Sequence, residues 1–138
     1  MQKLCIFGQR IAMTKHEIVL MSITGEDKPG VTSSLTEILS KHNATILDIG
    51  QANIHQSLSL GILFRLDPVM QGNILKDLLF KSYELGVQAK FTPIEREDYD
   101  QWVSRQGKES YVITVLGQKI EANQLAHVTK VIAEQGLN

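Results

Sequence analysis

Hydrophobic and polar positions follow two periods along this chain, one typical of strands and the other typical of helices. Residues 17–24 and 45–55 are rich in strand-forming side chains, and residues 58–66 place an apolar side chain at every second position. Apolar side chains recur at every third or fourth position over 31–42 and 74–83, which predicts two amphipathic helices with one buried stripe each.

A further alternation over residues 87–91, closed by Pro93, predicts a fourth strand, so the expected order is βαββαβ. Asn43 and Gly86 follow the two helical patterns and are typical helix stops. Two right-handed crossovers would fold residues 16–94 into an antiparallel four-stranded sheet with both helices on one face. The sequence therefore predicts the ferredoxin-like arrangement of the α+β class, whose second sheet face is open to a partner.

The turn between the first strand and the first helix carries most of the candidate chemistry. Pro29 fixes its own φ, and Gly30 has no Cβ, so a ligand could approach the backbone closely. The N–H groups of Gly30, Val31 and Thr32 at the helix start would favour a carboxylate. Asp27 would accept hydrogen bonds from an ammonium group. The alternative is that Pro-Gly only begins the helix and that Asp27 caps it.

The pattern after the fourth strand begins to repeat the first part of the chain. Residues 95–109 are polar and charged, which predicts a linker or a surface helix. Strand character returns at residues 111–116, and a helical stripe follows over 125–132. The spacing of this helix after Gly117 matches that of the first helix after Gly25, with an offset of one residue.

This internal repeat predicts a second copy of the same unit that is cut short. Residues 110–138 would form its first half (βα), and the chain ends where its second strand should begin, so we expect a fragment of a longer protein. The alternative is that the repeat is coincidental and that the same residues form a docked βα arm. Residues 1–15 would be an N-terminal extension.

Composition and charge argue against several classes of function. The 138 residues are 43% hydrophobic, enough for a packed core, and their net charge of −1 includes no basic block, which argues against a nucleic-acid surface. No apolar run reaches the roughly 18 residues of a membrane-spanning helix. Cys5 is the only cysteine and no export signal is recognisable, so we expect a cytoplasmic protein without an intramolecular disulfide.

The first turn carries a resemblance to a known family. The string Ile-Thr-Gly-Glu-Asp-Lys-Pro-Gly-Val at residues 23–31 resembles the first turn of ACT domains, small-molecule-sensing βαββαβ modules attached to enzymes of amino-acid metabolism. Residues 25–66, including Asp-Ile-Gly-Gln at 48–51, most resemble the tandem N-terminal ACT domains of bacterial phosphoserine phosphatases. Residues 116–118 resemble the start of their second copy.

The resemblance implies a regulatory region of L-serine biosynthesis that is not itself an enzyme and that senses a small amino acid, serine or glycine. The family's haloacid-dehalogenase-like phosphatase domain, which is expected to use Mg²⁺, is not part of this sequence, and the chain itself would need no cofactor. The resemblance also implies a set of ligand-binding residues, namely Asp27, Lys28, Gly30, Val31, Thr32 and Thr45.

The sequence departs from the serine-sensing ACT domains of a related dehydrogenase family. Gly25 stands where that family has His, Asp27 stands where it has Asn, and Thr45 stands where it has a second Asn. In the second copy, Ile-Glu-Ala at residues 120–122 replaces Pro-Gly, so that turn is less suited to close approach by a ligand. The identity of the ligand stays open.

Two patterns suggest catalysis or metal binding but lack the context that each needs. Residues 98–100 have the D-x-D form of a haloacid-dehalogenase nucleophile, yet they follow charged residues, and Trp102 stands where that motif has Thr. We expect a solvated acidic turn there and no catalytic residue. The four histidines show no metal-ligand spacing, and His42 lies on the buried stripe of the first helix, so we expect it to be packed and expect no metal site.

A second hypothesis is a protein-interaction module that binds no ligand, like the double-ACT transcription regulators of glycine metabolism. The residues encoded after Asn138 would discriminate, because a D-x-D-x-T nucleophile would support the phosphatase and an early stop would support the regulator. Under both hypotheses an unpaired strand edge and uncovered apolar side chains predict a homodimer, with exchange of the βα arm as one form of it.

Overall fold

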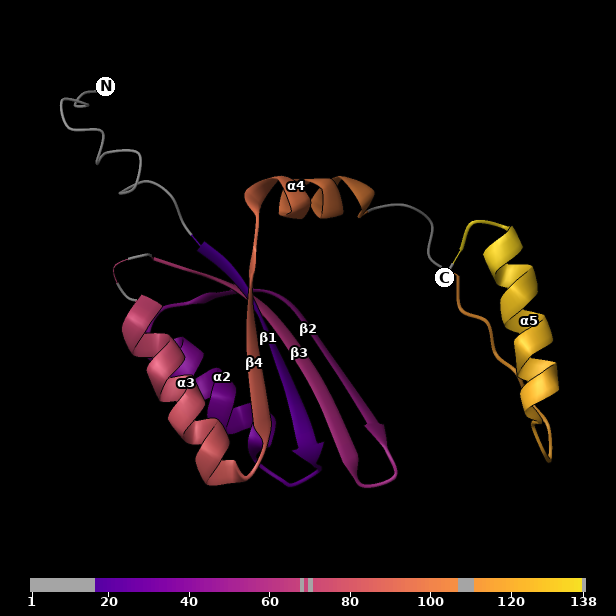
Figure 1. Cartoon of the computed structure of the whole chain (residues 1–138), viewed down its shortest axis with the longest axis horizontal. Helices are drawn as coiled ribbons and strands as arrows, with labels where there is room; N and C mark the ends of the chain where they lie inside the picture. Colours follow the sequence, from indigo (N-terminus) through magenta and orange to yellow (C-terminus); the bar gives the residue numbers. More distant parts are fainter. Residues whose placement is uncertain (1–16, 68, 70, 107–110, 138) are drawn as a thin grey trace. The chain divides into compact units, whose positions relative to one another are not determined.

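The computed structural model describes most of the chain, namely residues 17–67, 69, 71–106 and 111–137. Its helices and strands are, in order, β1 (Glu17–Glu26), α2 (Val31–Lys41), β2 (Thr45–Ile54), β3 (Ser57–Leu66), α3 (Gln71–Leu85), β4 (Gln88–Ile94), α4 (Arg96–Arg105) and α5 (Ala122–Glu134). They belong to two units, Met1–Gln106 and Gly107–Asn138 (Figure 1). The expected extension at 1–15, which includes Cys5, lies outside the described residues.

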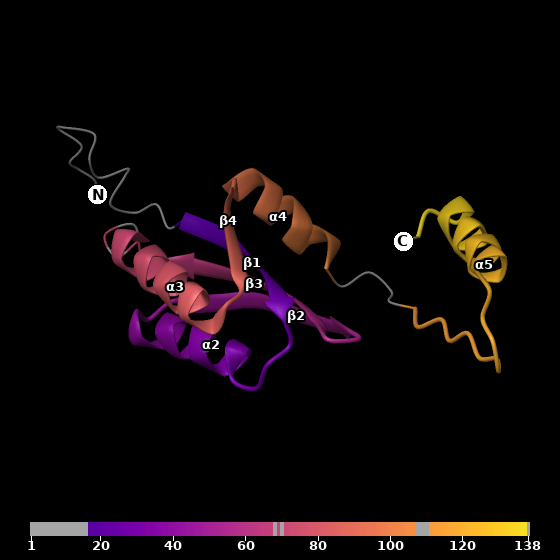
Figure 2. The same ribbon diagram turned by 60° about the horizontal axis from the view of Figure 1, so that its bottom comes forward.

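An antiparallel sheet with the strand order β2-β3-β1-β4 forms the centre of the first unit. β1 lies between β3 and β4, and Met21 stands opposite Ile62 on one side and Phe91 on the other. The face of β1 that carries Val19, Met21 and Ile23 is buried, whereas Leu20 and Ser22 on its other face are only partly buried. Both α2 and α3 lie on the same side of the sheet (Figures 1 and 2), so the predicted ferredoxin-like βαββαβ fold is confirmed.

The hydrophobic core lies between the sheet and these two helices. Alternate residues of β1 and β3 face α2 and α3, and each helix meets them with side chains one turn apart. The largest fully buried apolar side chains are Phe64, Met21, Ile23, Leu35, Leu39, Leu58, Leu60, Ile62, Ile74 and Leu78. Burial of each stabilises the fold by about 1.5–3 kcal/mol, which fixes the position of the loops at the sheet's ends.

Both core helices end as the sequence predicts. Asn43 takes the left-handed conformation, with φ 55°, and the N–H of the next residue donates to the carbonyl of Leu39 at 3.0 Å. Gly86 follows α3 with φ 71°, and the next N–H donates to the carbonyl of Ser82 at 3.0 Å. These bonds occupy carbonyls that the helix ends would otherwise leave without a partner.

His42 is packed, as expected from its place on the helix stripe. Its Nε2 lies 2.8 Å from the carboxylate of Asp77, so the side chain joins the end of α2 to the middle of α3. The His42 side chain is 15% exposed, and its buried Nδ1 has no hydrogen-bond partner. The contact is therefore structural within this unit.

The ends of three strands differ from those expected. β1 continues through Glu26, and the hairpin after β2 turns one residue earlier than expected, at His55 and Gln56, with His55 at φ 56°. β4 is not closed by Pro93, because that residue pairs with Val19 inside the strand. Proline is tolerated there because β4 is an edge strand of the sheet, and only one of its sides donates to a neighbour.

Most of the polar segment after β4 forms a helix without buried residues, α4, which is the surface helix that the sequence offered as one of two alternatives. The rings of Tyr99 and Trp102, one turn apart on this helix, have centroids 5.7 Å apart. Residues 98–100 are therefore part of a helix, so the expected acidic turn is wrong. The remainder of the expected linker, 107–109, lies outside the described residues.

The second unit contains one helix, α5, among its described residues. Glu121 and Gln124 form a capping box at its start, as the Gln124 side chain accepts the Glu121 N–H at 3.0 Å. The strand expected over 111–116 is wrong, because these residues form no strand. A strand needs a neighbour to take its backbone hydrogen bonds, and the described part of this unit offers none. The assignment of 110–138 to half of a second domain stays a prediction.

Candidate ligand-binding site

The connection between β1 and α2 is a tight turn whose backbone conformation depends on the proline and the glycine within it. The N–H of Val31 donates to the carbonyl of Lys28 at 3.4 Å, and Gly30 has φ 94° and ψ −5°. These values match the third position of a type II turn, which requires a positive φ and therefore favours glycine. Proline at the second position supplies the fixed φ of that turn. Pro29 and Gly30 thus bring the chain directly into the first turn of α2.

The start of α2 presents backbone N–H groups to this turn. The first helical hydrogen bond runs from the N–H of Ser34 to the carbonyl of Gly30, at 2.9 Å. The N–H groups of Thr32 and Ser33 precede it and have no helical carbonyl to bond. The N–H of Val31, which the sequence suggested as a ligand donor, is already bonded within the turn. The N–H of Ser33 is free to donate to a ligand instead. Together with the helix dipole, these two groups favour an anion.

Asp27 does not cap the helix, so that part of the alternative is wrong, although Pro29 and Gly30 do lead directly into α2. Gly30 is the N-cap residue of α2, and no side chain bonds to the cap. The N–H of Asp27 instead donates to the carbonyl of Gln56 at 2.8 Å, which ties the turn to the β2–β3 hairpin. Its carboxylate accepts a hydrogen bond from the side-chain amide of Asn53. The carboxylate therefore faces β2 instead of the helix axis.

Two polar side chains of β2 extend this contact into a network. The hydroxyl of Thr32 donates to Oε1 of Gln51 at 2.8 Å, and Nε2 of Gln51 donates to Oδ1 of Asn53 at 3.1 Å. Asn53 in turn donates to the Asp27 carboxylate. The network links the helix start, the turn and the edge strand through side chains that are largely exposed to solvent.

A β-bulge places these two side chains on the helix-facing side of the sheet. Ile46 pairs with a residue of the core face of β3, and the register then shifts by one residue between Ile46 and Asp48. Beyond this shift, Gln51 and Asn53 pair with core-facing residues of β3. Simple alternation from Ile46 would put both on the other face. The sequence reasoning therefore missed them, and their polar spacing of two was the one available signal.

These groups surround a pocket of about 440 Å³. Its lining consists of Asp27, Lys28, Pro29, Gly30, Val31, Thr32, Ser33, Gln51, Asn53 and Leu58. It includes five of the six ligand-binding residues expected from the sequence. The ammonium of the lining residue Lys28 lies 3.6 Å from the carboxylate of Glu26. The pocket thus combines a carboxylate, two amides, a hydroxyl and helix-start N–H groups within one small volume.

Thr45 is the expected site residue that the fold does not bring to the pocket. It begins β2 and pairs with Arg65, whereas Asn53 lies near the other end of the same strand. At about 3.3 Å per residue, the strand separates these two residues by roughly 25 Å. A ligand held in the pocket of the same unit would therefore not contact Thr45.

The arrangement suits a small zwitterion. A carboxylate such as that of Asp27 accepts hydrogen bonds from an ammonium group, and the N–H groups at the start of α2 donate to a carboxylate. Gln51 and Asn53 each offer both a donor and an acceptor for a polar side chain. In the described residues no cluster of three His, Cys, Asp or Glu could hold a metal ion, and no helix among them is long and apolar enough to span a membrane.

Comparison with protein families and sequences places these features in context. The family model described as the ACT domain matches residues 17–92. Phosphoserine phosphatase SerB2 of Mycobacterium tuberculosis is 37% identical over 123 residues, which are 87% of this chain and 29% of that protein. The chain therefore spans less than a third of the length of this relative. A UPF0237 protein of Methanopyrus kandleri is 30% identical over 70 residues, 49% of this chain and 78% of that protein.

Solved structures share the fold at low sequence identity. A protein provisionally described as a glycine cleavage system transcriptional repressor superposes with a TM-score of 0.58 at 14% identity, over 62% of this chain and 50% of that one. An ACT domain protein from Streptococcus pneumoniae gives a TM-score of 0.50 at 15% identity, over 56% of this chain and 89% of that one. At these identities the likeness concerns the fold alone.

Proposed function

Because the chain belongs to the ACT domain family, whose domains are regulatory and not catalytic, we propose that it senses a small amino acid for a phosphoserine phosphatase of L-serine biosynthesis. The pocket at the β1–α2 turn carries this proposal, because it combines one carboxylate with the N–H groups of a helix start. The name of the similar mycobacterial protein supports the choice of enzyme. The sensor would act in the cytoplasm on L-serine or glycine, without a cofactor of its own.

The proposed binding mode assigns each end of the ligand to a different part of the turn. The ammonium group bonds to the carboxylate of Asp27, and the ligand carboxylate accepts from the N–H groups of Thr32 and Ser33. Asn53 already bonds to Asp27. When the ligand binds, the Asn53 amide must move away or share the Asp27 carboxylate with the ligand. The carboxylate then accepts from a charged ammonium group where it had accepted from a neutral amide.

The energetics of this exchange set the scale of the affinity effect. Hydrogen bonds to charged groups contribute about 1.5–3 kcal/mol each. Loss of the ammonium contact therefore weakens binding roughly 10- to 150-fold, at about 1.4 kcal/mol for each factor of ten. Asp27 and Asn53 are exposed side chains, so loss of their own bond affects the stability of the fold much less.

Regulation requires two states that the ligand distinguishes. The ligand bridges the β1–α2 turn and β2, so it stabilises whichever arrangement keeps these two segments together. We expect a second ACT unit, in a homodimer of the chain, to contact these segments only in that arrangement. Ligand binding would then be coupled to the activity of the attached enzyme by a free energy of interaction between the two sites.

The test is a calorimetric titration of the chain with L-serine, repeated on two variants. Asp27→Ala removes the proposed ammonium acceptor and should weaken binding roughly 10- to 150-fold. Asp98→Ala, an exposed residue of α4 outside the pocket, is the matched control and should bind like the unchanged chain. Equal affinities for the Asp27 variant and the control would contradict the assignment.

A further inference from the structure

The polar side chains of the pocket bond to one another in a direction that one carboxylate decides. A carboxylate accepts hydrogen bonds and donates none, so Asn53 must present its Nδ2 to Asp27. Oδ1 of Asn53 then lies on the other side and accepts from Nε2 of Gln51 at 3.1 Å. Oε1 of Gln51 is left facing Thr32, whose hydroxyl donates to it at 2.8 Å. The amide of Gln51 therefore has one defined orientation in the pocket.

This network leaves half of the hydrogen-bonding capacity of Gln51 for a further partner. A side-chain amide has two N–H donors and two acceptor lone pairs. Gln51 uses one donor for Asn53 and one lone pair for Thr32. One N–H and one lone pair remain on the same planar group. A hydroxyl can use both, because it donates one hydrogen bond and accepts others.

Gln51 lies beside the path between the two groups proposed to hold the ends of the ligand. Its amide bonds to the side chain of Thr32, whose N–H would hold the ligand carboxylate. Asn53, two residues further along β2 and so about 7 Å away, bonds to Asp27, which would hold the ammonium. The carboxylate has a second oxygen, so it can accept from both. A short ligand side chain between these ends can therefore reach Gln51.

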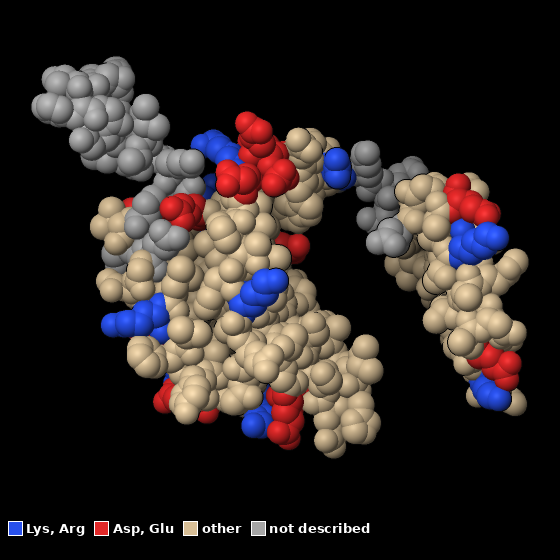
Figure 3. All heavy atoms as spheres, in the orientation of Figure 1, with Lys and Arg blue, Asp and Glu red and all other residues tan. Residues whose placement is uncertain are grey.

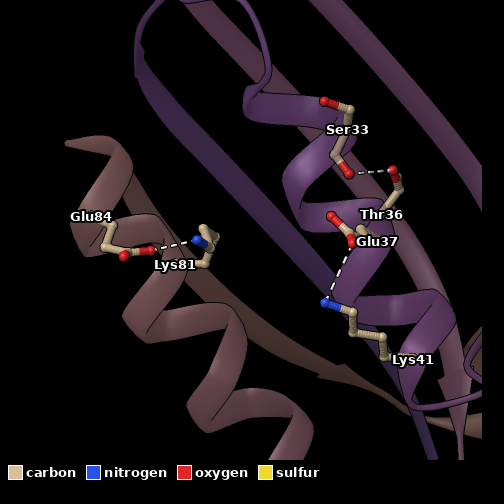
Figure 4. Close-up of polar contacts among 6 residues, drawn as sticks. All are labelled: Ser33, Thr36, Glu37, Lys41, Lys81 and Glu84. Atoms are coloured by element: carbon tan, nitrogen blue, oxygen red, sulfur yellow. Dashed lines mark hydrogen bonds and ion pairs between the residues drawn. The ribbon is translucent and has the colours of Figure 1, made fainter.

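The start of α2 is held in place by its own side chains. The hydroxyl of Thr36 donates to the carbonyls of Thr32 and Ser33 at 3.0 and 3.1 Å, and Figure 4 shows the second of these bonds. Oγ of Ser33 donates to the carbonyl of Gly30 at 3.2 Å. These bonds use carbonyls and not the N–H groups of the first turn. The position of a bound carboxylate relative to Gln51 is therefore fixed, as a specificity contact requires.

Charge does not separate one neutral side chain from another at this site. The described lining carries one acidic residue, Asp27, and one basic residue, Lys28, whose Nζ lies 3.6 Å from the carboxylate of Glu26. On the face drawn in Figure 3, charged side chains of the first unit lie in small groups and not in a broad patch of one sign. Amino acids that differ only in a neutral side chain are therefore distinguished by local hydrogen bonds.

We propose that Gln51 determines the specificity of the pocket by bonding to a hydroxyl on the first side-chain carbon of the ligand. The ligand class is then the small hydroxyl amino acids, L-serine and L-threonine, in preference to glycine and L-alanine. The inference rests on the proposed function, because it concerns the same pocket. Gln51 is exposed, so its replacement has little effect on the stability of the fold.

Calorimetric titration of the full chain with L-serine and with L-alanine tests this role, because the two amino acids differ only by the hydroxyl. Two neutral hydrogen bonds should make L-serine bind at least about fivefold more tightly than L-alanine. Gln51→Met keeps the length of the side chain but removes the amide, so the two affinities should become equal within about twofold. Gln88→Met, an exposed residue of the other edge strand and outside the pocket, is the matched control and should keep the preference.

The possible outcomes separate failure of this inference from failure of the proposed function. Equal affinity of the unchanged chain for both amino acids, or a preference that survives in Gln51→Met, would overturn the inference and leave the proposed function standing. Binding of neither amino acid would contradict the proposed function and the inference with it. As a second measurement, the side-chain amide resonances of Gln51 should shift further at saturation with L-serine than with L-alanine, and equal shifts would also overturn the inference.

Discussion

Replacement of Gly30 by alanine tests two properties of the turn, the strain of its backbone conformation and its contact with the ligand. The residue has φ 94°, where a Cβ costs about 1–2 kcal/mol. An added Cβ would meet only Oγ of Ser33, at 3.9 Å, so no clash adds to this strain. We therefore expect Gly30→Ala to lower the free energy of unfolding by about 1–2 kcal/mol. A domain of this size would then melt several degrees lower, at about 4–8 °C per kcal/mol.

The effect of the same change on binding has a different cause. Gly30 lines the pocket beside the N–H groups that would hold the ligand carboxylate, so the new methyl group occupies part of the space for the ligand. Loss of one such charged hydrogen bond would weaken binding roughly 10- to 150-fold. Thermal unfolding and calorimetric titration with L-serine measure the two effects on the same protein.

Gly86 offers a matched control in the same unit. It has φ 71°, and its added Cβ would lie at an ordinary contact distance of 3.6 Å from Nζ of Lys28. Gly86→Ala should therefore lose a similar amount of stability but keep its affinity within about twofold, since Gly86 does not line the pocket. If Gly30→Ala loses stability and still binds L-serine normally, the ligand does not approach this turn, and the reasoning fails.

Three further changes test the packing that positions the site. Leu35→Ala, in the fully buried stripe of α2, should cost about 2–5 kcal/mol in urea unfolding, and a cost below 1 kcal/mol would contradict the core described. Gly25→Ala would bring a Cβ to 2.9 Å from Val87 Cγ1 and 3.2 Å from its Cα, so overpacking should cost about 1–3 kcal/mol; unchanged melting would argue against that contact. Asp77→Ala should cost about 1 kcal/mol through loss of the bond to His42, and Lys41→Ala, which loses only an exposed ion pair, should cost less.

Local signals in the sequence were sufficient for most of the first unit. The alternation from Leu58 to Leu66 identified β3, because every second residue of that strand is apolar and buried in the core. Asn43 marked the end of α2, because a left-handed stop depends on the residue itself. Pro29 and Gly30 fixed the turn for the same reason. Features decided by one or two neighbouring residues could thus be predicted without the fold.

Features that depend on residues distant in the sequence could not be predicted from local patterns. The segment 111–116 has strand composition, yet a strand forms only where a neighbour accepts its hydrogen bonds. Pro93 would end most strands, and only the edge position of β4 permits it. Gln51 and Asn53 reach the pocket because a bulge after Ile46 shifts the register, and no local pattern shows that shift.

The central claim is that a free amino acid binds at the β1–α2 turn, and chemical-shift mapping of the ¹⁵N-labelled chain with L-serine tests it most directly. We predict saturable shifts that are largest for the backbone N–H groups of Thr32 and Ser33 and for the side-chain amides of Gln51 and Asn53. Glycine, added as a second titrant, should shift the same backbone groups. Shifts confined to other parts of the chain, or none with either amino acid, would contradict the claim.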